Sequence, residues 1–251
     1  MPARQQGGIS TNGSEAIPEE AVILAGGLGK RLRQIVPDLP KPMAPVGDRP
    51  FLAHLLTTLA QQGVRRIVLS VGYKSEIFVN YFGNDFNGVE LVYAVEEQPM
   101  GTAGGIRLGL EMVHGNRAFI LNGDTLFNVS LARLAKTFAT HHAKVVMAVR
   151  PMVDCARYGA VDIKDERITG FQEKGRHGAG LINGGVFLLS TSLQHDLLDC
   201  FSFENDFLQP NINRMVMAAV VSDGFFIDIG VPEDYAAAQT LLVNQPQQVF
   251  V

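Results

Sequence analysis

The feature that most constrains the fold is a short apolar run, AVILA at residues 21–25, which stops at Gly26 and Gly27. A continuous apolar run of this length is typical of a strand buried on both faces, as in a parallel sheet covered by helices. Glycines directly after such a strand let backbone N–H groups approach a ligand closely. The sequence therefore predicts a parallel sheet with a binding loop at the end of its first strand.

Strand-like and helix-like segments alternate through about residue 125. Buried strands are expected at 66–71, 90–95 and 118–121, and helices at 51–62, 75–82 and 104–113. This alternation predicts an α/β fold with a Rossmann-like, doubly wound mixed sheet, which binds ligands at the carboxyl ends of its strands.

The second half of the chain is richer in strands and has few long helices. Strands are expected at 144–149, 159–163, 168–171, 185–189 and 225–229, followed by a closing amphipathic helix at 232–243. We expect these strands to form an antiparallel extension laid against the first sheet. No clean linker separates the halves, so residues 19–251 are expected to form a single domain. Residues 1–18 are polar and glycine-rich, which predicts a flexible N-terminal arm.

Composition excludes several classes of protein. The chain has 21 Lys and Arg against 25 Asp and Glu, a net charge of -4, which argues against nucleic-acid binding. Its two cysteines, Cys155 and Cys200, form no CxxC motif and suit a reducing compartment. No run approaches the ~18 apolar residues of a membrane helix, and the N-terminus lacks the apolar stretch of a signal peptide. We therefore expect a cytoplasmic protein with neither a nucleic-acid nor a membrane partner.

The loop after the first strand reads LAGGLGKRL at residues 24–32. Lys30 and Arg31 can add charge-assisted hydrogen bonds to an anion that the glycine backbone holds. A dinucleotide site would place Gly at Leu32, and a Walker loop would end in Gly-Lys-Ser/Thr. A tight turn without a ligand is the alternative for the glycines alone. The loop thus predicts phosphate binding outside the NAD and P-loop ATPase classes.

Lys41 stands between Pro40 and Pro42, ten residues after Arg31. Prolines on both sides restrict the backbone and hold the lysine extended. A lysine presented in this way beside a phosphate loop suits a phosphate that is being transferred.

Further motifs follow in order: QPMGTAGG at 98–105, NGDT at 122–125, FQEK at 171–174, NGG at 183–185 and FIDIG at 226–230. Together with GGLGKRL and LPKPMAPV, they resemble the sugar-1-phosphate nucleotidylyltransferases over about residues 20–243. Within that family, LPKPMAPVGDRPFL, LNGDTLFNV, LINGGVFLLS and FFIDIGVPEDY are most similar to the D-glycero-D-manno-heptose 1-phosphate guanylyltransferases. The resemblance implies the nucleotide-diphospho-sugar transferase fold and a Mg²⁺-dependent reaction that joins a sugar 1-phosphate to a nucleoside triphosphate.

The resemblance also implies a role for each motif. Asp124 and Asp228 would hold Mg²⁺, which needs few protein carboxylates when substrate oxygens and waters complete its shell. The catalytic residues would be these two aspartates with Arg31 and Lys41. Nucleotide binding would involve Leu24, Ala25, Gly26, Gly27, Gly29, Lys30, Arg31, Gln98, Gly101, Thr102, Gly104 and Asp124. The sugar phosphate would bind to Asn122, Gly123, Tyr158, Gly159, Glu173, Lys174, Asn183 and Gly184.

The implied division places nucleotide binding in residues 19–130 and sugar-phosphate binding in residues 131–251. The implied substrates are GTP and the heptose 1-phosphate, giving GDP-heptose for a capsule, O-antigen or S-layer polysaccharide. Alternatives of the same chemistry are mannose-1-phosphate guanylyl transfer and glucose-1-phosphate thymidylyl or uridylyl transfer. A catalytically inactive sugar-nucleotide sensor is the alternative from another class. A homodimer is a further expectation, since the family often forms dimers.

Overall fold

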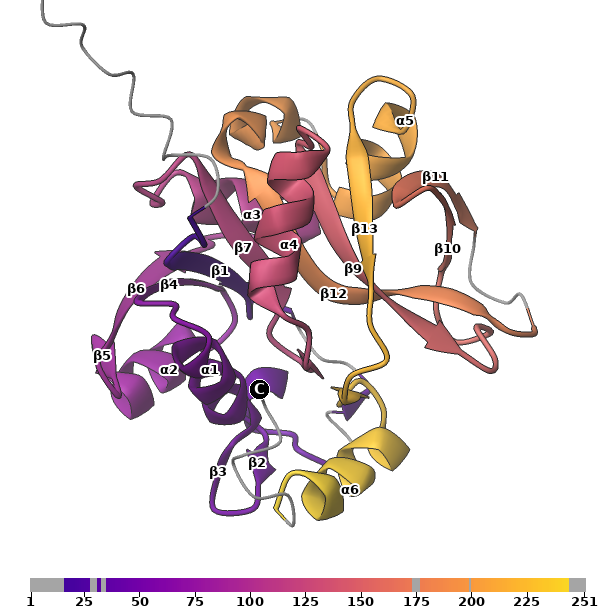
Figure 1. The fold of residues 1–251 in the computed structure, drawn as a ribbon. Helices are drawn as coiled ribbons and strands as arrows, with labels where there is room; N and C mark the ends of the chain where they lie inside the picture. Colours follow the sequence, from indigo (N-terminus) through magenta and orange to yellow (C-terminus); the bar gives the residue numbers. More distant parts are fainter. Residues whose placement is uncertain (1–15, 28–30, 33–34, 173–176, 199, 244–251) are drawn as a thin grey trace, which may run out of the picture.

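A ten-stranded mixed sheet runs through the part of the chain that the computed structural model describes, residues 16–27, 31–32, 35–172, 177–198 and 200–243 (Figure 1). The strand order is β10-β11-β13-β9-β12-β7-β1-β4-β6-β5. Its strands are β1 Glu20–Leu24, β4 Arg66–Val71, β5 Asp85–Phe86, β6 Val89–Val95, β7 Arg117–Asn122, β9 Val145–Met152, β10 Ala160–Lys164, β11 Arg167–Gln172, β12 Gly180–Ser190 and β13 Met217–Val221. Two small sheets pair β2 Pro45–Val46 with β3 Arg49–Pro50, and β8 Thr125–Phe127 with β14 Phe226–Asp228.

The helices are α1 Phe51–Gln61, α2 Ser75–Phe82, α3 Gly101–Leu110, α4 Leu131–Thr140, α5 Gln209–Asn211 and α6 Pro232–Leu241. Segments of 3₁₀ helix occupy Lys41–Met43 and Thr191–Leu197, and a π-helical segment spans Phe203–Leu208. None of the described helices is both long and apolar enough to cross a bilayer.

The first half forms the parallel part of the sheet, as the sequence predicted. β1 lies between β4 and β7 and is parallel to both. Leu24 at its end pairs with Ser70 of β4 and with Asn122 of β7. The carboxyl ends of the three strands therefore meet at one edge, where the chain turns into the glycine-rich loop and the NGD turn.

The second half extends the same sheet beyond β7, and the predicted mixed sheet with an extension is confirmed. β12 pairs antiparallel with β7 and with β9, which joins the two halves edge to edge. β13 then adds parallel to β9, and β11 and β10 follow antiparallel. The expected antiparallel pairing is confirmed for β12, β11 and β10, whereas β13 is parallel to β9.

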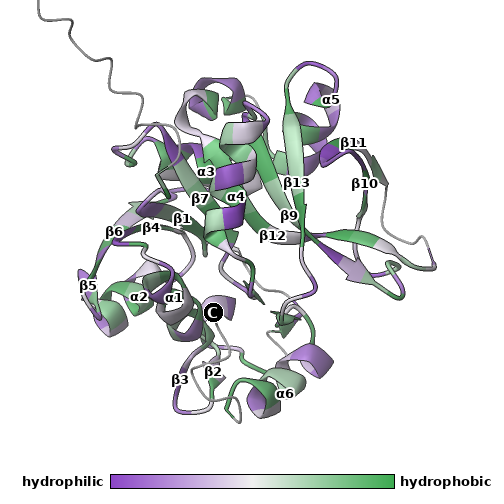
Figure 2. Cartoon of the chain, in the orientation of Figure 1, coloured by the Kyte–Doolittle hydropathy of each residue, from purple (hydrophilic) through white to green (hydrophobic). Residues whose placement is uncertain are grey.

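Helices cover both faces of the sheet, because side chains along a strand alternate between its faces. On one face, Ala21 and Ile23 of β1 pack with the buried sides of α1, α2 and α4. On the other face, Val22 packs with α3 and with the segments 191–197 and 203–208. Figure 1 shows α4 in front of the strands and α3 behind them, and Figure 2 shows the hydrophobic colouring concentrated on the central strands.

Two elements of the second half differ from the sequence prediction. α4 was not expected, although Ser130 caps it by accepting from the backbone N–H of Arg133, and Leu131, Leu134 and Ala135 form a buried stripe. The expected strand at 225–229 exists as β14, but it pairs with β8 outside the main sheet. α6 starts where the closing helix was expected, yet Ala238 is its one buried residue.

The contact between α3 and β1 leads to a test of packing. A Cβ at Gly109 of α3 would overlap Cγ1 of the buried Val22. In an unhindered helix, Ala is more favourable than Gly by up to ~1 kcal/mol. We nevertheless expect Gly109→Ala to lower the free energy of unfolding by roughly 1–3 kcal/mol, the usual cost of overpacking a core. Equilibrium unfolding in urea measures this free energy for the variant and the wild type.

Gly72→Ala serves as the control, because a Cβ at Gly72 would meet no atom closer than 3.6 Å. A Gly109→Ala variant more stable than the wild type would contradict the close approach of α3 to β1.

Candidate active site

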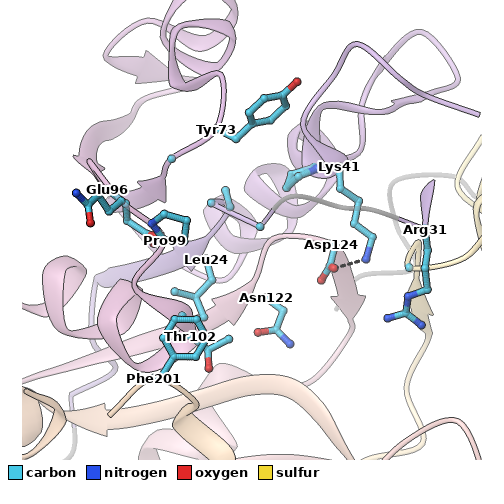
Figure 3. A pocket seen from close by; sticks show the side chains of 18 of the residues that line it. Leu24, Arg31, Lys41, Tyr73, Glu96, Pro99, Thr102, Asn122, Asp124 and Phe201 are labelled. Atoms are coloured by element: carbon cyan, nitrogen blue, oxygen red, sulfur yellow. Dashed lines mark hydrogen bonds and ion pairs between the residues drawn. The ribbon is translucent and has the colours of Figure 1, made fainter. Parts of the chain in front are cut away.

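A pocket of about 860 Å³ opens at the carboxyl ends of β1, β4 and β7. Its size lies within the usual range for small-molecule sites. The lining residues are Leu24, Ala25, Gly26, Gly27, Arg31, Lys41, Pro42, Gly72, Tyr73, Glu96, Glu97, Gln98, Pro99, Gly101, Thr102, Asn122, Asp124, Phe201 and Gly230. In Figure 3, Arg31, Lys41 and Asp124 lie at one end of this pocket and Glu96 and Pro99 at the other.

Most residues expected to bind the nucleotide line this pocket. Gly104 does not line it, because it lies inside α3, where a Cβ would overlap the side chain of Met100. Gly29 and Lys30 were also expected here, and both lie outside the described residues. Gly101 has a positive φ of 72°, and a Cβ there would collide with the backbone of Phe201, so the start of α3 requires glycine.

A second pocket of about 510 Å³ adjoins the first. It is lined by Asn122, Thr125, Tyr158, Gly159, Ala160, Val161, Phe171, Asn183, Gly184, Gly185, Glu204, Asn205, Gln209, Phe226 and Asp228. Five of the expected sugar-phosphate residues are among them: Asn122, Tyr158, Gly159, Asn183 and Gly184.

The other three expected residues do not line the second pocket. Gly123 closes the turn behind the pocket wall, where its N–H donates to the carbonyl oxygen of Leu24 at 2.9 Å. A Cβ at Gly123 would come within 2.7 Å of that oxygen. Glu173 and Lys174 lie outside the described residues.

The two pockets meet at Asn122, which lines both, and at a charged cluster beside it. Lys41 forms an ion pair with Asp124, and its Nζ lies 3.9 Å from Oδ1 of Asp228. Pro42 and Met43 are buried, which anchors the segment that carries Lys41. The backbone at Lys41 forms a 3₁₀ turn and is not extended, so that expectation from the flanking prolines is wrong. The Lys41 side chain is only 12% exposed, so its ammonium points into the junction rather than into solvent.

Pairing of β8 with β14 places the two aspartates together. Asp228 lies opposite Thr125 in this pairing, and the N–H of Ile229 donates to the carbonyl oxygen of Asp124 at 3.0 Å. Asp124 itself stands in the turn between β7 and β8 rather than at the end of a strand. The sequence therefore identified both carboxylates, and the small sheet determines their proximity.

The environment of Asp228 is unfavourable for its negative charge. Burial and the nearby Asp124 carboxylate raise the pKa of Asp228, while Lys41 and the N–H of Gly230 act in the opposite direction. Burial and the charge of Asp228 also raise the pKa of Tyr158, so this phenol stays protonated and able to donate a hydrogen bond. The junction thus carries negative charge that a ligand with positive charge would neutralise.

The described donor set fits a Mg²⁺ ion that is completed by substrate. No cluster of three or more His, Cys, Asp or Glu side chains occurs among the described residues, so a closed protein cage is not formed there. Mg²⁺ commonly takes one or two carboxylates and keeps waters or phosphate oxygens in its remaining positions. Asp124 and Asp228 supply that number of carboxylates between the two pockets.

Several lining residues were missed by the sequence analysis. Pro99 belongs to the motif that begins at Gln98, and Glu96 precedes that motif by two residues, so their positions could have identified them. Phe201 and Glu204 come from a segment with no glycine motif, and their sequence carried no comparable signal. Tyr73 lies two residues after the end of β4, at the sheet edge where binding residues gather.

Because the negative charge of Asp228 is unfavourable, neutralising Asp228 and neutralising Asp124 should change the thermal stability of the protein in opposite directions. A carboxyl whose folded-state pKa is raised costs folding free energy above that pKa, and the cost disappears as the pH falls through it. Asp228→Asn should therefore raise the thermal midpoint in metal-free buffer at pH 7. An Asn oxygen still accepts from the N–H of Gly230, as Asp228 does at 2.5 Å.

Asp124→Asn is the matched comparison, and it should lower the midpoint because Lys41 loses the nearer of its two carboxylate partners and keeps only Asp228 at 3.9 Å. A loss of roughly 1–3 kcal/mol is expected for a hydrogen bond between charged groups. Differential scanning fluorimetry with EDTA measures both variants. Destabilisation of the Asp228→Asn protein would contradict the assigned charge environment.

Comparison with known proteins identifies the family to which the chain is similar. The family described as Nucleotidyl transferase matches residues 20–245. The chain is 42% identical over 222 residues to the D-glycero-alpha-D-manno-heptose 1-phosphate guanylyltransferase of Aneurinibacillus thermoaerophilus. The aligned residues make up 88% of this chain and 96% of that protein. It is also 42% identical over 219 residues to the enzyme of the same name from Campylobacter jejuni, and this alignment covers 86% of this chain and 96% of that enzyme.

Among solved structures, HddC from Yersinia pseudotuberculosis complexed with GMP-PN superposes with a TM-score of 0.79 at 36% identity. The superposition covers 89% of this chain and 99% of that one. The match of residues 20–245 to the family and the 42% identity to its members show that the chain belongs to the nucleotidyl transferase family.

Proposed function

We propose that the protein transfers a guanylyl group from GTP to D-glycero-α-D-manno-heptose 1-phosphate and releases pyrophosphate. The observation that carries the proposal is the junction at which the pockets meet, where Lys41, Asp124 and Asp228 converge. A nucleotide in the larger pocket and a sugar 1-phosphate in the smaller one would bring their phosphates to this point. The substrates are those of the relatives that are 42% identical over most of the chain.

The proposed reaction needs no general base. An oxygen of the sugar phosphate attacks the α-phosphorus of GTP, a new P–O bond forms, and the bond to the β-phosphate oxygen breaks. The attacking phosphate is already ionised, and pyrophosphate carries away the electron pair of the broken bond. Catalysis then depends on holding the reacting groups in line and stabilising the charge that develops.

Each charged residue of the junction has a part in this scheme. Lys41 neutralises charge at the α-phosphate, and Arg31 holds the β- and γ-phosphates. Lys174, outside the described residues, is assigned to the sugar phosphate by its motif. Mg²⁺ bound by Asp124 and Asp228 would offset negative charge on the phosphates of both substrates.

The far end of the larger pocket supports guanine as the base. Glu96, Glu97 and Gln98 line that end, so two carboxylates and an amide border the space for the base. The Glu96 carboxylate also accepts from the N–H of Met100 at 3.3 Å and from the hydroxyl of Ser70 at 3.4 Å. An ionised carboxylate only accepts hydrogen bonds. Guanine offers adjacent N1–H and amino donors, whereas adenine and cytosine present a ring nitrogen acceptor beside their amino groups. Uracil and thymine offer a single donor flanked by two carbonyl oxygens.

We further propose that residues 19–130 bind the nucleotide and residues 131–251 bind the sugar phosphate, as expected from the sequence. The larger pocket is lined mainly by residues before 125, with Phe201 and Gly230 added, and the smaller one mainly by residues after that point. A cytoplasmic location accords with the use of GTP. The expectation of a homodimer stays a prediction.

The first test is pyrophosphate release in the presence of Mg²⁺. GTP, UTP, dTTP, CTP and ATP are each combined with heptose, mannose and glucose 1-phosphates. We expect strong release with GTP and the heptose 1-phosphate because the pockets accept a donor-rich base and a polyol. Release with another pair would keep the chemistry and replace the substrates. No release by folded protein that still binds a nucleotide would indicate the inactive sensor.

Lys41 provides a second test, which addresses the mechanism. We expect Lys41→Ala to lower kcat by about 10²–10³, the usual effect of removing one electrostatic stabiliser of a transition state. The KM for GTP should change much less. Lys136→Ala, an exposed lysine on α4, is the control. An unchanged kcat in Lys41→Ala would contradict the assigned role.

A further inference from the structure

One wall of the smaller pocket comes from the segment 202–209, which the sequence analysis did not assign to any role. Phe203 and Phe207 of this segment are buried with their rings stacked at 5.5 Å, which anchors the segment in the core. The polar residues Glu204, Asn205 and Gln209 are exposed and line the pocket. The segment therefore presents a polar edge to the space where the sugar would bind.

Backbone hydrogen bonds hold this segment in place. The Asp206 carboxylate accepts from the N–H groups of Phe201 at 2.9 Å and Ser202 at 2.7 Å. The N–H of Phe203 donates to the hydroxyl oxygen of Thr102 in α3 at 2.8 Å. The backbone that precedes Glu204 is thus held both by its own segment and by Thr102, which lines the larger pocket.

Asn183 of β12 orients the Glu204 side chain. Oδ1 of Asn183 accepts from the N–H of Gly185 at 2.8 Å, so its Nδ2 must be the group that faces Glu204. Nδ2 donates to Oε1 of Glu204 at 2.5 Å. Among described residues Asn183 is the one hydrogen-bonding partner of this carboxylate, so its remaining lone pairs are available to a ligand.

The chemistry of the pocket indicates which part of the substrate Glu204 contacts. None of the described lining residues is a lysine or an arginine, so this wall does not attract a phosphate. An ionised carboxylate repels phosphate but accepts hydrogen bonds from hydroxyl groups. Its two oxygens can accept from two neighbouring hydroxyls at once.

We propose that Glu204 is a specificity residue for the sugar, and that Asn183 holds its carboxylate so that it accepts from two adjacent sugar hydroxyls. The proposal rests on the proposed function, since it assumes a sugar 1-phosphate in the smaller pocket. With Glu204 on the hydroxyls, the phosphate of the substrate is directed away from this wall and toward the junction at Lys41.

Two variants separate this role from a structural one. A Gln at position 204 can still accept from Nδ2 of Asn183, but it loses the charge and one acceptor oxygen. We expect Glu204→Gln to raise the KM for heptose 1-phosphate roughly tenfold, the size expected for a hydrogen bond to a charged group, while the KM for GTP is unchanged. Glu204→Ala, which also loses the contact with Asn183, should raise that KM at least as much.

Glu166→Gln is the control, an exposed carboxylate that pairs with His141 instead of lining either pocket. An unchanged sugar KM in Glu204→Gln would overturn the proposal and leave only a contact that supports Asn183. Equal increases in both KM values would overturn it as well, because a structural disturbance would affect both substrates.

The same variants locate the hydroxyls. Mannose 1-phosphate lacks the additional side-chain carbon and hydroxyl of the heptose. A loss confined to the heptose substrate would assign Glu204 to the side-chain hydroxyls, and an equal loss with both sugars would assign it to ring hydroxyls. Both results support the proposal.

Calorimetric titration with heptose 1-phosphate measures sugar binding separately from turnover, so the two proposals can fail independently. If the wild type binds heptose 1-phosphate in the titration but releases no pyrophosphate when GTP is also present, the proposed function fails. The affinity ratio between wild type and Glu204→Gln then still decides the role of Glu204, and equal affinities would overturn it.

Discussion

The site depends on the pairing of two short strands. β8 and β14 have three residues each, and their ladder holds Asp228 opposite Thr125, one residue from Asp124. Without this pairing, a carboxylate from near the end of the chain would have no reason to lie beside the NGD turn. Lys41 approaches the same point from a buried, proline-flanked turn. The charged junction is therefore made by three segments that are far apart in sequence, two of which meet in the small β8–β14 sheet.

Charge is distributed unevenly around this junction. Arg31 and Lys41 line the larger pocket near the junction, whereas Glu96 and Glu97 line its far end and Glu204 lines the smaller pocket. Groups rich in hydrogen-bond donors are favoured at the two ends, whereas the middle combines these cations with the carboxylates of Asp124 and Asp228. Burial and the neighbouring Asp124 carboxylate raise the pKa of Asp228, so a negative charge on Asp228 is unfavourable in this middle region. Such a cost is typical of a binding site, where a ligand supplies the missing charge.

Much of the fold could be predicted from local patterns. The strand at 66–71 and the helix at 75–82 occur over the predicted residues, because buried runs and helical spacing are local properties. α4 was missed although Leu131, Leu134 and Ala135 have helical spacing, since the surrounding segments are strand-like. Sheet continuity could not be predicted, because the pairing of β12 with both β7 and β9 depends on contacts between distant segments.

The candidate site divides in the same way. Glycine loops, the proline-flanked Lys41 and the two aspartates are recognisable in the sequence, because each requires particular residue types within a short motif. The sequence by itself thus determined the class of fold, the parallel first half and the chemistry that the motifs can perform. Only the tertiary structure decided that Asp228 lies beside Asp124 and that Glu204, held by Asn183, lines the second pocket. Those positions arise from strand pairing and core packing across the whole chain, which no local pattern encodes.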